Sequence, residues 1–202
     1  MPTMSASVIS NVSDTARWVA VYRARESARP DALFHDPYAQ LLAGEQGQAI
    51  AAFMPRQARN GWPMIARTKL MDDLILATIQ QGCDCVVNLA AGFDTRPYRL
   101  EVPASLRWIE ADLPDLTEEK EQLLKGAEPR CQLRRVKVDL AESSTRVATL
   151  KEAVGTSANV LVITEGLLLY LEEAQVRSLA TDVGAQAFVG GSWTSPRRRC
   201  WK

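Results

Sequence analysis

From Cys83 onward, short apolar runs rich in β-branched residues alternate with amphipathic stretches of helical length, and this alternation constrains the fold more than any other feature. The candidate strands cover 85–90, 106–111, 134–140 and 159–164. The candidate helices cover 113–125, 146–154 and 172–183. Such alternation predicts a parallel sheet with helices on both faces. We therefore expect an α/β, Rossmann-like fold that binds its ligand beyond the carboxyl ends of the strands.

The first 82 residues contain only helical patterns. A helix is expected to start at Ser13 or Asp14, and short helices follow over 38–43 and 46–53. A longer helix over 63–80 carries apolar residues at helical spacing, namely Ile65, Leu70, Leu74 and Ile75. These patterns predict an N-terminal helical lobe over 1–82, a Rossmann-like core over 83–190 and an irregular basic tail over 191–202.

Composition excludes several classes of protein. The chain has 202 residues, enough for one domain with an extra lobe, and its 24 basic residues balance its 24 acidic ones. No net field attracts nucleic acid, and the polar start together with the lack of a long apolar run predicts no membrane partner and a cytoplasmic location. The four cysteines match neither a redox pair nor a zinc site, and no metal constellation is expected: Cys83, Cys85, Cys131 and Cys200.

The segment 88–96 follows the first candidate strand and is the expected cofactor loop. It reads Asn-Leu-Ala-Ala-Gly-Phe-Asp-Thr-Arg, so Ala90 and Thr95 stand where a dinucleotide motif has glycines. Small residues through Gly92 allow the backbone to approach a ligand closely. The carboxylate of Asp94 would repel a pyrophosphate but suits a cationic ligand such as S-adenosylmethionine (SAM). An ordinary strand-to-helix turn is the alternative interpretation.

Acidic residues also follow the other three candidate strands. Asp112 comes 20 residues after Gly92, where a carboxylate can accept hydrogen bonds from a ribose diol. Glu110 is expected to point the same way, but Asp112 stands closer to the strand end. Asp139 could accept from an adenine amino group, with the adjacent Leu140 against the ring. Glu165 would lie near the cofactor, unless it only complements a helix N-terminus.

Several stretches, taken together and in this order, resemble the leucine carboxyl methyltransferase family and its bacterial O-methyltransferase relatives. They cover most of the chain, from about 13 to 183. The matching stretches are Arg23-Ala24-Arg25-Glu26, Asp36-Pro37-Tyr38-Ala39, Ala66-Arg67-Thr68-Lys69, the segment 88–96, Glu110-Ala111-Asp112-Leu113-Pro114, Val138-Asp139-Leu140 and Thr164-Glu165-Gly166-Leu167. The resemblance implies a class I SAM-dependent methyltransferase with a Rossmann-like fold.

The resemblance also implies a role for each site residue. Arg67 would pair with the carboxylate of the methionine part of SAM, and Arg23 is a weaker candidate for the same pocket. By the same resemblance Asp112 would hold the ribose, Asp139 with Leu140 the adenine, and Glu165 the methionine end. Ala90 departs from the usual glycine of the family. Because alanine is small, we expect binding to survive if this residue has ordinary strand dihedral angles.

The implied reaction is SN2 transfer of a methyl group to an oxygen of a small-molecule or carboxylate acceptor. A carboxylate needs no general base, and the only histidine, His35, is expected to be a structural turn residue. The catalytic residues are therefore unknown. Family members are longer, so we expect a chain that lacks the last strands and leaves strand 159–164 at an edge. The alternatives are a SAM-binding remnant without activity and, disfavoured by Asp94, an NAD-dependent oxidoreductase.

Overall fold

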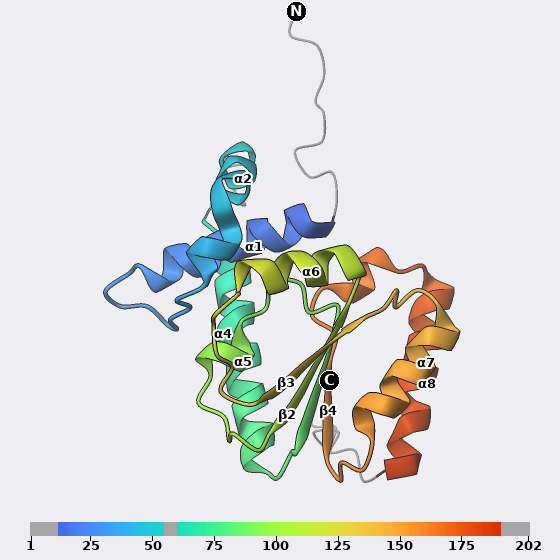
Figure 1. Ribbon diagram of the computed structural model, residues 1–202. Helices are drawn as coiled ribbons and strands as arrows, with labels where there is room; N and C mark the ends of the chain where they lie inside the picture. Colours follow the sequence, from blue (N-terminus) through green and yellow to red (C-terminus); the bar gives the residue numbers. More distant parts are fainter. Residues whose placement is uncertain (1–11, 55–59, 191–202) are drawn as a thin grey trace, which may run out of the picture.

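The structure is a computed structural model that describes residues 12–54 and 60–190, and within them it contains a four-stranded parallel sheet (Figure 1). The strands are β1 (Cys85–Leu89), β2 (Arg107–Asp112), β3 (Gln132–Lys137) and β4 (Val160–Ile163), in the order β3-β2-β1-β4. The predicted α/β fold with a parallel sheet is confirmed. β3 ends earlier than expected, at Lys137, so Asp139 and Leu140 follow the strand in a loop.

Helices cover both faces of the sheet, as predicted. On one face α7 (Ser143–Val154) and α8 (Glu173–Gly190) pack against alternate residues of β1 and β2 through Leu150 and Leu179. On the other face α4 (Trp62–Gln80) packs through Ile75. All five residues of β1 are buried, as expected for a central strand covered on both sides. Two shorter helices follow the first two strands: α5 (Arg96–Arg99) and α6 (Pro114–Leu123).

The first two helices lie at the carboxyl end of the sheet (Figure 1). α1 (Val12–Ser27) and α2 (Ala39–Phe53) pack on each other through small and branched residues, with Phe93 and Leu116 of the core in the same cluster. α2 is interrupted at Gly44, where φ is +56°, which explains why the sequence predicts two short helices here. This packing places α1 above the strand ends.

The apolar pattern predicted for α4 is half wrong. Ile65 and Ile75 are buried with Asp72, but Leu70 and Leu74 are 62% and 59% exposed. At about 100° per residue, the three buried positions share one face of the helix. Leu70 and Leu74 fall on the opposite face, away from the sheet. The predicted boundary near residue 82 lies between α4 and β1, but α4 packs on the sheet, so the division into lobe and core remains a prediction.

The remaining expectations concern the cysteines, membranes and metals. Cys83, Cys85 and Cys131 are buried free thiols, and burial raises the pKa of Cys131 to about 11. Among residues 12–54 and 60–190, no helix is both long and apolar enough to cross a bilayer, and no three His, Cys, Asp or Glu residues gather as they would around a metal ion. The basic tail over 191–202, with Cys200, lies outside the described residues.

Candidate functional site

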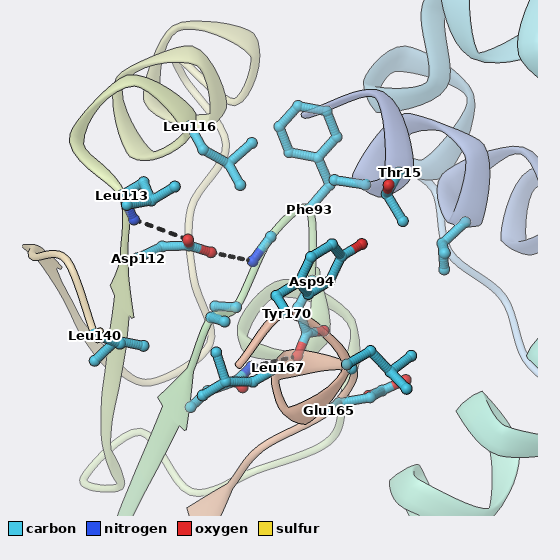
Figure 2. A pocket seen from close by; sticks show the side chains of 18 of the residues that line it. Thr15, Phe93, Asp94, Asp112, Leu113, Leu116, Leu140, Glu165, Leu167 and Tyr170 are labelled. Carbon is cyan, nitrogen blue, oxygen red and sulfur yellow. Dashed lines mark hydrogen bonds between the residues drawn. The ribbon is translucent and has the colours of Figure 1, made fainter. Parts of the chain in front are cut away.

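A cavity of about 310 Å³ opens at the carboxyl ends of β1, β2 and β4 (Figure 2). Its size is typical of small-molecule sites. All nine residues predicted from the sequence line it. These residues are Arg23, Arg67, Ala90, Gly92, Asp94, Asp112, Asp139, Leu140 and Glu165. The strand ends therefore bring together residues that are separated by up to 142 positions in the chain.

Asp112 is the last residue of β2 and is 7% exposed. Its Oδ2 accepts a hydrogen bond from the Gly92 amide at 2.6 Å, and its Oδ1 accepts one from the Leu113 amide at 2.8 Å (Figure 2). Burial raises the pKa of Asp112, and the two amide donors oppose that rise. Each oxygen retains a second lone pair, so the carboxylate can still accept hydrogen bonds from a pair of hydroxyl groups.

Ala90 does not have the strand dihedral angles on which its tolerance was predicted to depend. Its φ is +56°, and it is the only non-glycine residue with a positive φ in the part of the chain that the structure describes. That condition is not met because the chain turns sharply at Ala90 on leaving β1, while the Ala90 amide still donates to the Ala111 carbonyl at 2.8 Å. A Cβ in the left-handed region is strained, so alanine here costs stability that glycine would not.

Replacing Ala90 with glycine is expected to raise the free energy of unfolding by about 1 kcal/mol, because the left-handed conformation then carries no steric penalty. Urea denaturation followed by circular dichroism measures the change. The matched control is Ala91→Gly, since Ala91 has no positive φ and gains nothing from glycine. An Ala90→Gly variant no more stable than the parent would show that the loop is not strained.

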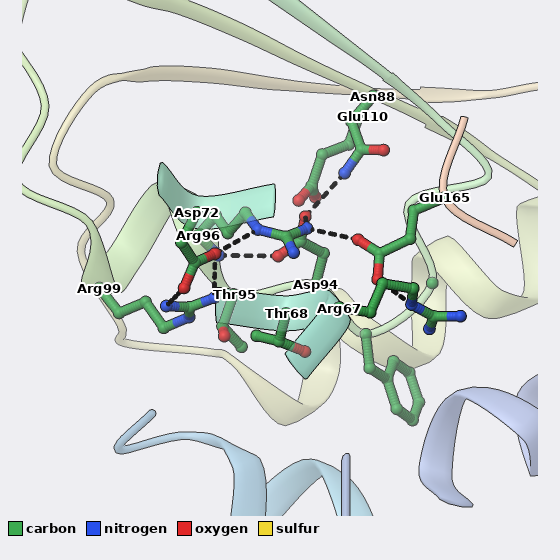
Figure 3. Close-up of polar contacts among 12 residues, drawn as sticks. Arg67, Thr68, Asp72, Asn88, Asp94, Thr95, Arg96, Arg99, Glu110 and Glu165 are labelled. Carbon is green, nitrogen blue, oxygen red and sulfur yellow. Dashed lines mark hydrogen bonds and ion pairs between the residues drawn. The ribbon is translucent and has the colours of Figure 1, made fainter. Parts of the chain in front are cut away.

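The methionine-side residues of the prediction, Arg67 and Glu165, form an ion pair across the cavity wall. Arg67 Nε donates to Glu165 Oε1 at 2.8 Å. Behind them, Arg96 donates from Nη1 to Glu165 at 2.8 Å and to Asp94 at 2.9 Å (Figure 3). Burial alone would raise the pKa of Asp94, but the Arg96 guanidinium, with Lys120 and Arg99 beyond it, holds that pKa well below its usual range. The carboxylate of Asp94 is thus ionised and engaged within the loop.

Arg23 lines the cavity, but its hydrogen bonds hold the structure around it. Its Nε donates to Asp36 Oδ2 at 2.8 Å and its Nη2 to the Phe93 carbonyl at 2.6 Å. Thr95 donates to the same Asp36 oxygen at 2.6 Å. Arg23 and Asp36 therefore tie α1 to the cavity loop, and both groups are buried.

Asp139 and Leu140 occupy the loop after β3. Leu140 is buried and packs in the sheet core, whereas Asp139 is exposed and accepts from the Ala141 amide at 2.9 Å. Arg146, fully buried on α7, donates to the Leu140 carbonyl at 2.6 Å. This hydrogen bond ties the loop after β3 to α7.

Part of the cavity wall was missed by sequence reasoning. α1 contributes Thr15, Trp18 and Val19, and the 3₁₀ turn η1 (Leu167–Tyr170) contributes Leu169 and Tyr170. Leu169 is 86% exposed, which is unusual for leucine and marks an apolar cavity mouth. The apolar periodicity of α1 indicates a buried face, but nothing in it distinguishes a face that covers a cavity from one that packs on a core.

Two other candidates lie outside this cavity. Glu110 shares the buried side of β2 with Asp112 but accepts from Lys120 at 2.8 Å and from Arg135 at 2.9 Å, so its charge is neutralised within the fold. His35 is exposed, and its Nδ1 lies 3.3 Å from the Ser27 carbonyl. Neither residue lines the cavity.

A parallel sheet in this order, with a cavity at its carboxyl end, is the arrangement of a Rossmann-like fold and agrees with that of class I methyltransferases. The chain belongs to the leucine carboxyl methyltransferase family, whose model matches residues 16–184. It is 35% identical to a Parafrankia protein over 86% of this chain and 59% of that protein. It is 34% identical to a Mycobacteroides abscessus protein over 91% of this chain and 64% of that protein. It is 36% identical to a Streptomyces coelicolor protein over 90% of this chain and 67% of that protein.

All three relatives are named provisionally as S-adenosyl-L-methionine-dependent methyltransferases. The chain thus spans about three fifths to two thirds of the length of these relatives.

Proposed function

We propose that this protein is a SAM-dependent methyltransferase that methylates an oxygen of a small-molecule or carboxylate acceptor. The observation that carries the proposal is the distribution of hydrogen-bonding groups along one cavity. Asp112 stands at one side with paired acceptor oxygens, and Glu165 stands at the other (Figure 2), where it accepts a hydrogen bond from Arg67. This arrangement suits a ligand with a ribose diol at one end and an amino acid at the other.

The residues present fit SAM in each of its parts. Asp112 would accept from the ribose hydroxyls, and Leu140 with Asp139 would contact the adenine. Arg67 would hold the carboxylate through its terminal nitrogens, because only its Nε has a hydrogen bond within the described residues. One buried acceptor on the cavity wall, Asn88 Oδ1, has no partner there either. A buried acceptor without a donor fits a ligand that brings an ammonium group.

When bound, SAM would supply a methyl group whose bond to sulfur breaks as its bond to the acceptor oxygen forms, leaving a neutral thioether. The protein's own task is to align the acceptor and exclude water. Trp18, Val19 and Tyr170 form an apolar mouth suited to that task. No histidine is among the described residues that line the cavity. A carboxylate acceptor is already ionised and needs no general base.

The test is methyl transfer from labelled SAM to a panel of carboxylates and phenols. We expect turnover with at least one acceptor and an unchanged rate in His35→Ala, because His35 lies outside the cavity. Binding of SAM without transfer to any acceptor would favour the alternative, a SAM-binding remnant without activity. Binding of NAD in place of SAM would contradict both.

A further inference from the structure

Arg96 lines the inner wall of the cavity and is held by three carboxylates from three different segments. Its side chain is 4% exposed. Its Nε donates to Asp72 on α4 at 2.7 Å, and its Nη1 donates to Asp94 in the loop after β1 and to Glu165 after β4 (Figure 3). Arg99 pairs with the same Asp72 at 2.6 and 2.8 Å, which fixes that anchor on α4.

Asp94, which Arg96 holds, in turn determines the direction of a neighbouring amide. Asn88, 2% exposed, donates from Nδ2 to Asp94 Oδ2 at 2.8 Å. A carboxylate can only accept, so the amide nitrogen must face Asp94 and the amide oxygen must face away. That oxygen is the buried acceptor that has no hydrogen-bond partner among the described residues.

Glu165 is likewise oriented from two sides. Its Oε2 accepts from Arg96 at 2.8 Å and its Oε1 from Arg67 at 2.8 Å. Each oxygen keeps one lone pair, and the residue is only partly buried on the cavity wall. Because the inner contact is to a buried guanidinium, one hydrogen bond still orients Glu165 if Arg67, whose side chain is 38% exposed, pairs with another group.

We propose that Arg96 is a positioning residue that orients Glu165 and, through Asp94, the amide oxygen of Asn88 as joint acceptors for the ammonium group of the ligand's amino-acid end. This inference rests on the proposed function. Among the described residues, the side chain of Arg96 makes no hydrogen bond to the adenosine side of the cavity, and two of its acceptors, Asp94 and Glu165, line the cavity on the methionine side. A residue needed only for folding would affect both halves of a ligand equally.

The experiment compares two probes that differ in the amino-acid part. S-adenosylhomocysteine carries the ammonium and carboxylate groups, whereas 5′-methylthioadenosine has only the adenosine half. Both are titrated calorimetrically into the full chain and its Arg96→Gln variant. We expect S-adenosylhomocysteine to bind at least about tenfold more weakly to the variant. The reason is that Glu165 and Asn88 are then no longer held in position to accept hydrogen bonds from its ammonium group. Binding of 5′-methylthioadenosine should change by less than about twofold.

The matched control is Arg107→Gln. Arg107 is likewise an arginine that donates several hydrogen bonds, to Val154, Ser157 and Ala153, but it is only partly buried and begins β2 at the end away from the cavity. Its loss should lower stability and leave the ratio of the two affinities unchanged. Equal weakening of both probes by Arg96→Gln, or no weakening of either, would overturn the proposal.

If Arg96→Gln does not fold, Arg96→Lys decides by the same two titrations. Lysine keeps the positive charge but cannot reach three carboxylates with a planar fork. A selective loss of S-adenosylhomocysteine binding supports the proposal, and an equal loss of both probes overturns it. If the parent chain binds neither probe, the proposed function fails and the inference fails with it. If the parent binds both probes but the ratio is unaffected by the variant, only the inference fails.

Discussion

Replacement of Asp112 by alanine is expected to weaken binding of S-adenosylhomocysteine by about a hundredfold or more. Two hydrogen bonds from ribose hydroxyls to a buried carboxylate are lost, each worth about 1.5–3 kcal/mol. The Gly92 amide, which donates to Asp112 at 2.6 Å, also loses its acceptor, and the loop then loses its fixed position. Isothermal titration calorimetry of the parent and the variant measures the change.

Two controls separate this contact from a general effect on the cavity. Asp112→Asn keeps an acceptor oxygen and should lose less affinity than Asp112→Ala. Asp139→Ala should lose less still, because Asp139 is exposed and its hydrogen bond to Ala141 is local. Unchanged binding in Asp112→Ala would refute the assignment of the ribose to this carboxylate.

Replacement of Glu110 by alanine is expected to lower the free energy of unfolding by about 3–5 kcal/mol, since it leaves a buried cation without its partner. Lys120 is 2% exposed and pairs with Glu110 at 2.8 Å, and Arg135 pairs with the other carboxylate oxygen. Because Lys120 is buried, water cannot reach it to replace the lost carboxylate as a hydrogen-bond partner. Urea denaturation of the parent and the variant gives the difference.

The surface variant Glu101→Ala is the control for this prediction. Glu101 is 86% exposed, and its ion pair with Arg130 should contribute less than about 1 kcal/mol. The double variant Glu110→Ala with Lys120→Met should recover part of the loss, because it removes the unpaired charge as well as its partner. A small effect of Glu110→Ala would mean that Lys120 finds another acceptor.

The sheet and the part of the cavity wall that follows the strand ends could be predicted from sequence because both depend on local patterns. Buried parallel strands are continuous apolar runs, and acidic residues such as Asp112 follow them directly. The dihedral angle of Ala90 could not be predicted, because it depends on how β1 leaves the sheet. The partners of Glu110 lie on α6 and β3, so only the folded chain distinguishes it from Asp112.

The same reason explains why the role of Arg96 was not predicted. Arg96 ends the predicted cofactor loop over 88–96, but its hydrogen-bond partner Asp72 lies on a helix 24 positions earlier. Nothing local in α4 indicates that a buried aspartate there faces an arginine of the cavity loop. Charged contacts across long chain separations carry no periodic signal.

The position of α1 over the strand ends links the ligand to the order of the N-terminal helices. One wall of the cavity belongs to α1, and Arg23 ties that helix to the Phe93 carbonyl in the wall formed by the loop after β1. A ligand bound between these two walls stabilises the docked position of α1. By linkage, docking of α1 favours ligand binding by the same free energy. Detachment of α1 therefore lowers the apparent affinity in proportion to the fraction of molecules in which it is detached. Helix docking and ligand occupancy form a single coupled equilibrium.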